Sequence, residues 1–214
     1  MTDWVVVPVK SIANGKSRLA PILSRPRRQR LNRDLLAHTL EVASEIVGRR
    51  QVVVVSQCLE TQEIAKSYGA WALREPRGMG LNRALGLARD HAVWRGATGV
   101  LVLPSDLPLA SPADLRHILH AGKHARSLVM CRDRHGHGTN ALYLRRPSKF
   151  RFRFGENSAA AHSDEAARRG LSEICLDVSA LGFDLDTPND YRDLGIMAPR
   201  ANANLAHGFI KILH

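Results

Sequence analysis

The chain has 214 residues, of which 44% are hydrophobic and 24% charged, and this is typical of one globular domain. No apolar run approaches the roughly 20 residues of a membrane span, so a membrane-spanning helix is excluded. The cysteines, Cys58, Cys131 and Cys175, are odd in number and widely spaced, which favours reduced thiols over a disulfide framework. A strand-like run starts at Trp4, so we expect no signal peptide and a cytoplasmic location.

The formal net charge of +11 is compatible with a nucleic-acid partner or with a substrate that carries several phosphates. Basic residues cluster within residues 25–30 and 145–153, whereas aromatic residues make up only 5% of the chain. A stacking platform for bases would have to come from Phe150, Phe152 and Phe154. Because no reading helix is recognisable, we expect a largely solvated basic surface and no nucleic-acid partner, with a basic nucleic-acid-binding domain as an alternative.

Strand and helix patterns alternate along the chain. Short, mostly β-branched runs predict buried strands over residues 4–9, 52–55, 100–103 and 128–130. Apolar residues at helical spacing, with glycine after some of the ends, predict helices over residues 31–47, 60–68, 82–94 and 159–169. Two further helices are predicted to start at Ser111 and Thr187, each of which is followed by proline and then by aspartate.

This order of elements predicts an α/β fold, a three-layer sandwich around a mixed, mostly parallel central sheet. We expect a single domain over residues 1–195 and a C-terminal tail over residues 196–214. The tail lacks an obvious apolar pattern, so it is either loosely packed or an arm that docks on a second subunit of a homodimer.

The loop after the first strand, residues 10–21, is rich in cations and small residues. Its Asn-Gly-Lys-Ser segment resembles the end of a phosphate-binding P-loop, but the full pattern needs glycine where Lys10 stands, so that interpretation fails. Backbone amides together with Lys16 and Arg18 could still cradle a triphosphate at the carboxyl edge of the sheet. A plain basic surface loop is the alternative.

Carboxylates follow two of the apolar runs. Asp184 and Asp186 are one residue apart, so in an extended segment both side chains point to the same face. Asp106 follows the run at residues 100–103. If these segments lie side by side, three carboxylates converge on a site that suits Mg²⁺ and phosphate chemistry. The alternative is that they are turn and capping residues, although Thr187 can cap the next helix without them.

The loop at residues 133–140 contains histidine and glycine. Cys131, His135 and His137 lack a fourth ligand and match no common zinc spacing, so we expect no zinc site. The glycines favour a ligand loop in which the backbone approaches an anion. Further on, Gly155 and Ser158 stand before a helix whose free amides could hold a phosphate or carboxylate, unless Ser158 serves only as a cap.

These segments occur together, and in this order the chain resembles the 2-phospho-L-lactate guanylyltransferase family, which makes a guanylated intermediate of the deazaflavin coenzyme F-420. The matching segments are residues 7–10, 15–21, 80–85, 103–108, 133–142, 154–158 and 184–188. The resemblance covers residues 4–194. Each segment is weak evidence alone, but the combination is specific.

The resemblance implies a nucleotidyltransferase fold similar to the nucleotide-diphospho-sugar transferases, with GTP as co-substrate and Mg²⁺ as cofactor. It also implies a three-carbon phospho-acid as acceptor: 3-phospho-D-glycerate, phosphoenolpyruvate or 2-phospho-L-lactate. The implied metal ligands are Asp106, Asp184 and Asp186. The implied catalytic residues are Lys16, Arg18 and Asp106. The implied acid-binding residues are Thr139, Asn140, Gly155 and Ser158, and the implied nucleotide-binding residues are Lys10, Ser56, Gly80, Leu81 and Asn82.

Two departures from the family pattern bear on the acid. His137 stands where a smaller residue is expected, and Cys131 precedes the loop, so either could reshape the acid pocket. We hypothesise that His137 biases the chain toward 3-phosphoglycerate and that the guanylated product is handed directly to the next enzyme. A guanylyltransferase acting on the molybdenum-cofactor pterin is a further alternative, although that class usually has a more glycine-rich first loop.

Overall fold

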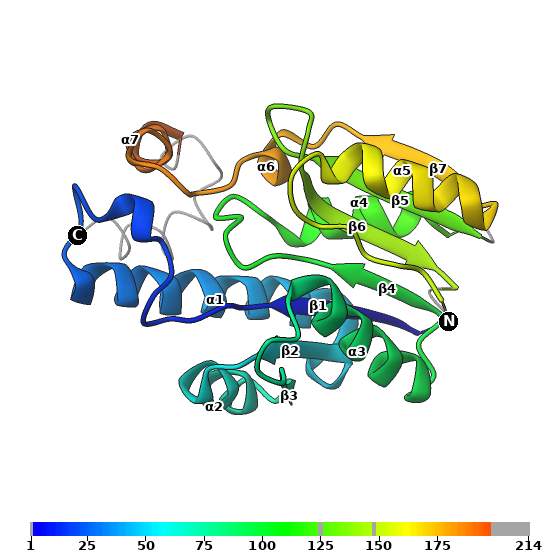
Figure 1. Cartoon of the computed structure of the whole chain (residues 1–214), viewed down its shortest axis with the longest axis horizontal. Coiled ribbons are helices and arrows are strands. Elements are labelled where there is room, and N and C mark those ends of the chain that lie inside the picture. Colours follow the sequence, from blue (N-terminus) through cyan, green and yellow to red (C-terminus); the bar gives the residue numbers. More distant parts are fainter. Residues whose placement is uncertain (1, 124–125, 147–148, 198–214) are drawn as a thin grey trace.

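The computed structural model describes residues 2–123, 126–146 and 149–197 and has a seven-stranded sheet in the order β3-β2-β1-β4-β6-β5-β7 (Figure 1). The strands are β1 (Asp3–Pro8), β2 (Val52–Ser56), β3 (Trp71–Arg74), β4 (Gly99–Val102), β5 (Ser127–Arg132), β6 (Thr139–Arg145) and β7 (Ser172–Leu176). Strand β6 runs antiparallel to β4 and β5, and the other neighbouring pairs are parallel. The predicted α/β fold with a mixed, mostly parallel sheet is therefore confirmed.

Helices cover both faces of this sheet. They are α1 (Arg25–Val47), α2 (Leu59–Ser67), α3 (Leu81–Trp94), α4 (Pro112–Ala121), α5 (Ser158–Arg169), α6 (Ser179–Gly182) and α7 (Pro188–Met197), with short 3-10 turns η1 (Ser17–Leu19) and η2 (Arg49–Gln51). Ser111 and Asp114 form the predicted capping box of α4. Helix α1 starts at Arg25, so it includes the basic residues 25–30 together with the predicted apolar pattern at residues 31–47, and Pro26 fits its first turn.

Successive residues of β1 point to opposite faces of the sheet and define two cores. Val5 and Val7 pack with α1, α2 and α4 on one face. Trp4 and Val6 pack with α3 and α5 on the other. This arrangement gives the three layers predicted from the sequence.

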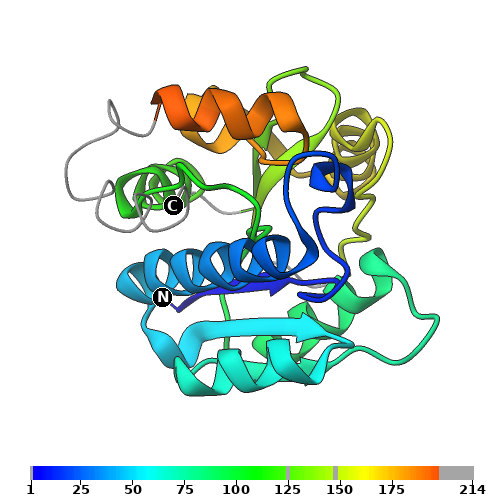
Figure 2. The ribbon, with the colours of Figure 1, turned by 90° about the vertical axis from the view of Figure 1, so that its left-hand side faces the viewer.

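A third apolar cluster joins the two ends of the described chain. Leu19 and Leu23, which precede α1, pack with Leu185 and with Leu194 of α7. Figure 2 shows α7 (orange) next to the blue loop that leads into α1. The expected tail at residues 196–214 lies outside the described residues from position 198 onward, and its role stays a prediction. No helix in the described ranges is long and apolar enough to cross a membrane.

Candidate active site

A cavity of about 810 Å³ lies at the carboxyl edge of the sheet, where α/β folds bind their ligands. Its walls come from the loop after β1, the ends of β2, β3 and β4, the first turn of α3, the start of β6 and the segment before α7. Segments from the beginning, middle and end of the chain therefore meet at one site. The predicted site residues that line the cavity are Lys10, Lys16, Gly80, Leu81, Asp106, Thr139, Asn140, Asp184 and Asp186.

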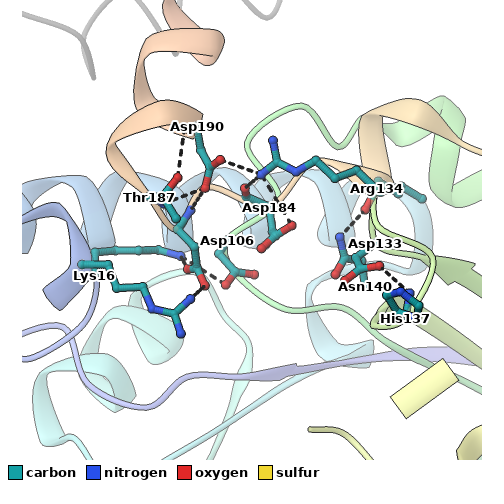
Figure 3. Close-up of polar contacts among 12 residues, drawn as sticks. Lys16, Asp106, Asp133, Arg134, His137, Asn140, Asp184, Thr187 and Asp190 are labelled. Atoms are coloured by element: carbon teal, nitrogen blue, oxygen red, sulfur yellow. Dashed lines mark hydrogen bonds and ion pairs between the residues drawn. The ribbon is translucent and has the colours of Figure 1, made fainter. Parts of the chain in front are cut away.

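Lys16 bridges two carboxylates in this cavity (Figure 3). Its Nζ lies 3.1 Å from Oδ2 of Asp106 and 2.8 Å from Oδ1 of Asp186. Burial by itself would lower the pKa of Lys16, but the charges of Asp106 and Asp186 outweigh it and raise the pKa above its ordinary value. The ammonium is therefore held fully charged. Arg18 lies further out, with Nη1 3.8 Å from Oδ2 of Asp186 and most of its side chain exposed.

The loop holds Lys16 in this position through a close backbone approach. Lys16 itself has a left-handed backbone, with φ of 55°. At the preceding Gly15, an added Cβ would lie 2.6 Å from Nδ2 of Asn32 and 2.8 Å from the carbonyl oxygen of Ser11. That same Asn32 amide donates to the Ile12 carbonyl at 2.9 Å. The loop can thus take this shape only with glycine at position 15.

The two C-terminal carboxylates face the cavity because their neighbours face the core. Phe183 and Leu185 are buried in the third apolar cluster, and side chains alternate along an extended segment. The amide of Leu185 donates to the Asp106 carbonyl at 3.0 Å, which sets the two acidic segments side by side. Burial, then the charge of Asp106 and that of Asp186, raise the pKa of Asp184, so negative charge is concentrated here.

A second set of contacts anchors the Asp184–Asp186 segment. Oδ2 of Asp190 accepts the amides of Asp186 at 2.8 Å and of Thr187 at 2.6 Å. Arg134 donates to Oδ1 of Asp190 at 2.7 Å and to the Asp184 carbonyl at 3.0 Å. The sequence indicated Asp190 only as part of a helix start, and Arg134 only as a member of the matching segment 133–142, with no role of its own. Both are supports of the acidic segment.

The residues expected to bind the acid divide into two groups. Thr139 and Asn140 line the cavity, and they begin β6 although the sequence placed them in a loop. Asn140 donates through Nδ2 to the Leu181 carbonyl at 2.9 Å. Gly155, which follows the lining residue Phe154, and the buried Ser158 are outside the cavity wall itself. His137 is also outside it, and its carbonyl accepts the amide of Ala159.

The residues expected to bind the nucleotide also fall into two groups, those that line the cavity and those whose side chains are engaged inside the fold. Lys10, Gly80 and Leu81 line the cavity. Ser56 is fully buried, and its Oγ accepts the amide of Cys58. The side-chain amide of Asn82 forms two hydrogen bonds with the backbone of Phe154. It donates to the carbonyl at 2.9 Å and accepts from the amide at 2.7 Å. Ser56 and Asn82 are therefore engaged in supporting the walls.

Gln57 and Glu75 are lining residues that the sequence did not suggest. They follow β2 and β3, and Nε2 of Gln57 donates to Oε1 of Glu75 at 3.0 Å. Their position directly after strands is the signal that could have identified them. Strand β3 was not predicted, because it is only four residues long and partly exposed.

The three cavity carboxylates are the candidates for a metal site. Among the described residues, no three Asp, Glu, His or Cys side chains are already arranged as a set of metal ligands, and Lys16 instead bridges two of the carboxylates. The donors themselves fit a hard divalent cation, because Asp106, Asp184 and Asp186 offer only oxygen and concentrate negative charge.

The fold is that of the nucleotidyltransferases. A candidate nucleotide-diphospho-sugar transferase from Desulfovibrio desulfuricans G20 superposes with a TM-score of 0.73 at 15% identity, over 100% of this chain and 97% of that one. A cytidylyltransferase from Leptospira borgpetersenii superposes with a TM-score of 0.63 at 14% identity, over 99% of this chain and 94% of that one. At these identities the likeness shows the fold alone.

The sequence relatives are more specific. A phosphoenolpyruvate guanylyltransferase from Sphaerobacter thermophilus is 41% identical over 93% of this chain and 95% of its own length. A 2-phospho-L-lactate guanylyltransferase from Methanothermobacter thermautotrophicus is 34% identical over 91% of this chain and 84% of its own length. The family model described as "Guanylyl transferase CofC like" matches residues 3–213. These findings favour the predicted family over the molybdenum-cofactor and nucleic-acid alternatives. The chain therefore belongs to the CofC-like guanylyl transferases and is a nucleotidyltransferase enzyme.

Proposed function

We propose that this guanylyltransferase transfers GMP from GTP to the phosphate of a three-carbon phospho-acid and releases pyrophosphate, with Mg²⁺ as cofactor. The observation that carries this proposal is the meeting of Lys16 with Asp106 and Asp186 in a cavity that Asp184 and Thr139 also line. One end of such a site can hold phosphates and metal, and the β6 wall can hold the acid.

The reaction needs no strong base from the protein. A phosphate monoester has a second pKa of about 6, so the acid's phosphate oxygen is already a nucleophile at neutral pH. It attacks the α-phosphorus of GTP, a new P–O bond forms, and the bond to the bridging oxygen of the β-phosphate breaks. Pyrophosphate leaves with that electron pair. The work of the protein is positioning and charge stabilisation.

Electrostatic repulsion is the main obstacle to the reaction, because the phosphate of the acid must come into contact with the α-phosphate of GTP. Mg²⁺ held by Asp106, Asp184 and Asp186 would neutralise the phosphate oxygens of both partners. Lys16 is the buried cation of the cavity wall, with its side chain 9% exposed, and it keeps Asp106 and Asp186 together before substrates arrive. We assign Lys16 and the more exposed Arg18 to the phosphates of GTP, where they stabilise charge on the leaving pyrophosphate.

We propose that Glu75 binds the guanine base of the nucleotide. Guanine presents two N–H donors on its pairing edge, N1–H and the 2-amino group, and a carboxylate accepts both. The Nε2 of Gln57 holds one oxygen of Glu75 at 3.0 Å, which fixes the orientation of the carboxylate. Adenine presents an acceptor at N1 and would face the carboxylate without a donor there. This arrangement supports GTP over ATP.

For the acid we propose phosphoenolpyruvate ahead of 3-phosphoglycerate, because the relatives at 41% and 38% identity are named phosphoenolpyruvate guanylyltransferases and His137 does not line the cavity. We place the reaction in coenzyme F-420 biosynthesis and expect the guanylated product to pass to the next enzyme. Unaltered flux with that enzyme supplied separately would count against the handover. The expected homodimer can be tested by sedimentation of the full chain.

One experiment tests the proposal directly. The full chain is incubated with GTP, Mg²⁺ and each of the three acids in turn, and pyrophosphate is measured against a reaction without acid. ATP replaces GTP in a parallel series. We expect acid-dependent pyrophosphate with GTP, and strongest with phosphoenolpyruvate. If no acid raises pyrophosphate above the acid-free reaction, the proposed function is wrong.

A further inference from the structure

His162 is a fully buried histidine directly behind the cavity wall. It lies on α5, and its relative exposure is 0%. Its ring is packed against Phe154 at 4.7 Å between centroids and against Phe150 at 6.0 Å. His162 does not line the cavity, and the proposed chemistry does not use it.

Both ring nitrogens of His162 have partners, and one partner fixes the tautomer. The backbone amide of Arg153 lies 3.0 Å from Nε2, and an amide N–H can only donate. Nε2 therefore carries a lone pair. The proton of a neutral ring must then sit on Nδ1, which lies 3.0 Å from Oγ1 of Thr139. His162 thus donates to the threonine hydroxyl.

This direction decides what Thr139 can do. Its Oγ1 accepts the proton of His162, so its own hydroxyl proton must point elsewhere. Within the protein Oγ1 donates that proton to Sδ of Met130, 3.4 Å away, and thioether sulfur is a weak acceptor. Thr139 is also a lining residue of the cavity. An anionic oxygen in the cavity is a far stronger acceptor than Met130, so the hydroxyl is prepared to donate to an anion.

We propose that His162 is a positioning residue, which orients the Thr139 hydroxyl as a hydrogen-bond donor to the phosphate or carboxylate of the acid substrate. This inference rests on the proposed function and deepens it, because it names how the acid side of the cavity is prepared. His162 acts through Thr139 and does not touch the substrate.

The same ring ties this wall to the rest of the fold. Residues 150–154 form an extended strap between α3 and α5. From α5, His162 holds the amide of Arg153, and Glu165 holds the amide of Arg151 at 3.3 Å. From α3, Asn82 holds the backbone of Phe154. Burial lowers the pKa of His162 to about 4, so the ring keeps its single proton throughout the neutral range.

The tautomer can be measured without any assay of activity. Nitrogen-15 NMR of the imidazole side chains in the full chain distinguishes a protonated Nδ1 from a protonated Nε2. We expect one histidine with Nδ1 protonated and Nε2 unprotonated between pH 7 and pH 5, and we expect its signal to disappear in His162→Gln. A protonated Nε2 at His162 would overturn the inference, because Thr139 would then have to donate to the ring.

Two variants separate the two hydrogen bonds. The side-chain amide nitrogen of His162→Asn can replace Nδ1 as donor to Thr139, whereas the amide oxygen of His162→Gln can replace Nε2 as acceptor for Arg153. We expect His162→Gln to raise KM for the phospho-acid about tenfold, as expected for one hydrogen bond to a charged group, while KM for GTP is unchanged. We expect His162→Asn to stay closer to the wild type.

A double-mutant cycle with Thr139→Val tests whether His162 acts through the hydroxyl. In the Thr139→Val background, we expect His162→Gln to have no further effect on KM for the acid. Glu165→Gln is the matched control, because Glu165 is buried on the same helix and holds the same strap without touching Thr139. We expect that control to change stability and to leave KM for the acid as it is.

The outcomes distinguish this inference from the function on which it rests. If the wild-type chain turns over no phospho-acid, the proposed function is overturned, and the inference falls with it. If the wild type is active but the effects of His162→Gln and Thr139→Val add up, or both KM values rise together, only the role of His162 is overturned.

Discussion

The ammonium of Lys16 lies 2.8 Å from Oδ1 of Asp186, which stands 170 positions later in the chain. The same ammonium reaches Asp106, 90 positions away. One cation near the start of the chain thus bridges two carboxylates, one from its middle and one from near its end. We expect this contact to matter more for reactivity than for folding, because the side chains of Asp106 and Asp186 are 34% and 40% exposed.

Replacement of the cation should therefore inactivate a folded protein. We expect Lys16→Met to lower kcat/KM for GTP at least about 100-fold, since charge on the transferring phosphates loses its fixed partner. Pyrophosphate release measures the loss, and circular dichroism checks the fold. Lys66→Met, at an exposed lysine of α2 paired with Glu63, is the control and should behave as the wild type. Activity of Lys16→Met near that control would contradict the assignment.

The carboxylates should be as sensitive as the lysine. We expect Asp106→Asn and Asp186→Asn each to lower turnover by orders of magnitude and to raise the Mg²⁺ concentration needed for half-maximal rate. Chelation of Mg²⁺ should stop the wild-type reaction, and added Mg²⁺ should restore it. Asp193→Asn, at an exposed position of α7, provides a control of equal charge change. Near-normal pyrophosphate release from either active-site variant would refute the metal assignment.

Glu75 offers a test of base selection. In Glu75→Gln the side chain keeps its size but offers one oxygen and one amide, so it can no longer accept two donors from guanine. We expect the preference for GTP over ITP, which lacks the 2-amino group, to fall about tenfold. Glu63→Gln, at an exposed glutamate of α2, is the control. If the ratio of kcat/KM for GTP and ITP stays the same, Glu75 does not recognise the 2-amino group of guanine.

Acid should destabilise the protein through His162. Its pKa is about 4 in the folded state, below the ordinary value of 6.5, so the unfolded chain binds the extra proton between these values. Its contribution to stability is complete above pH 6.5 and is lost as the pH falls toward 4, by about 3 kcal/mol in total. Urea unfolding at each pH measures this loss.

Other groups titrate too, so the difference between wild type and His162→Gln isolates this residue. His38 and His91 also have lowered pKa values and act in the same direction, but both variants share them. The carboxyl groups of Glu165 and Asp190, with lowered pKa values, contribute to the loss in more acidic solution. Parallel stability curves for wild type and His162→Gln between pH 7 and pH 4.5 would disagree with the prediction.

Asp190 should support both stability and activity. Asp190→Ala removes the acceptor for the amides of Asp186 and Thr187 and the partner of Arg134. We expect a loss of about 1–2 kcal/mol in the free energy of unfolding, as for other helix caps. Turnover should fall as well, because Asp186 loses its fixed backbone. Asp193→Ala on the same helix should affect neither quantity.

The sequence predicted the parts of the site that depend on short-range alternation. Asp184 and Asp186 share a face because Phe183 and Leu185 occupy the other, and that pattern is visible in these four residues. Likewise the β-branched run before Asp106 placed it at the carboxyl edge of the sheet. Such features need no knowledge of distant partners.

Features that depend on distant partners were not predictable. The sequence predicted that Asn82 binds the nucleotide, but its side-chain amide is hydrogen-bonded to the backbone of Phe154, 72 positions later. His162 looked like an ordinary helix residue, because its link to Thr139 spans 23 positions and two elements. Glu75 follows a strand too short and too exposed to recognise. Which polar groups are engaged inside the fold and which face a ligand is settled by tertiary contacts.

The backbone bond from Leu185 to Asp106 has a consequence for how the protein is made. A ribosome must synthesise the chain through residue 186 before the three carboxylates can meet. Five of the seven strands are complete by residue 132, so a nascent chain can begin to bury its core long before it can react. The carboxylate cluster is therefore one of the later parts of the fold to form during synthesis.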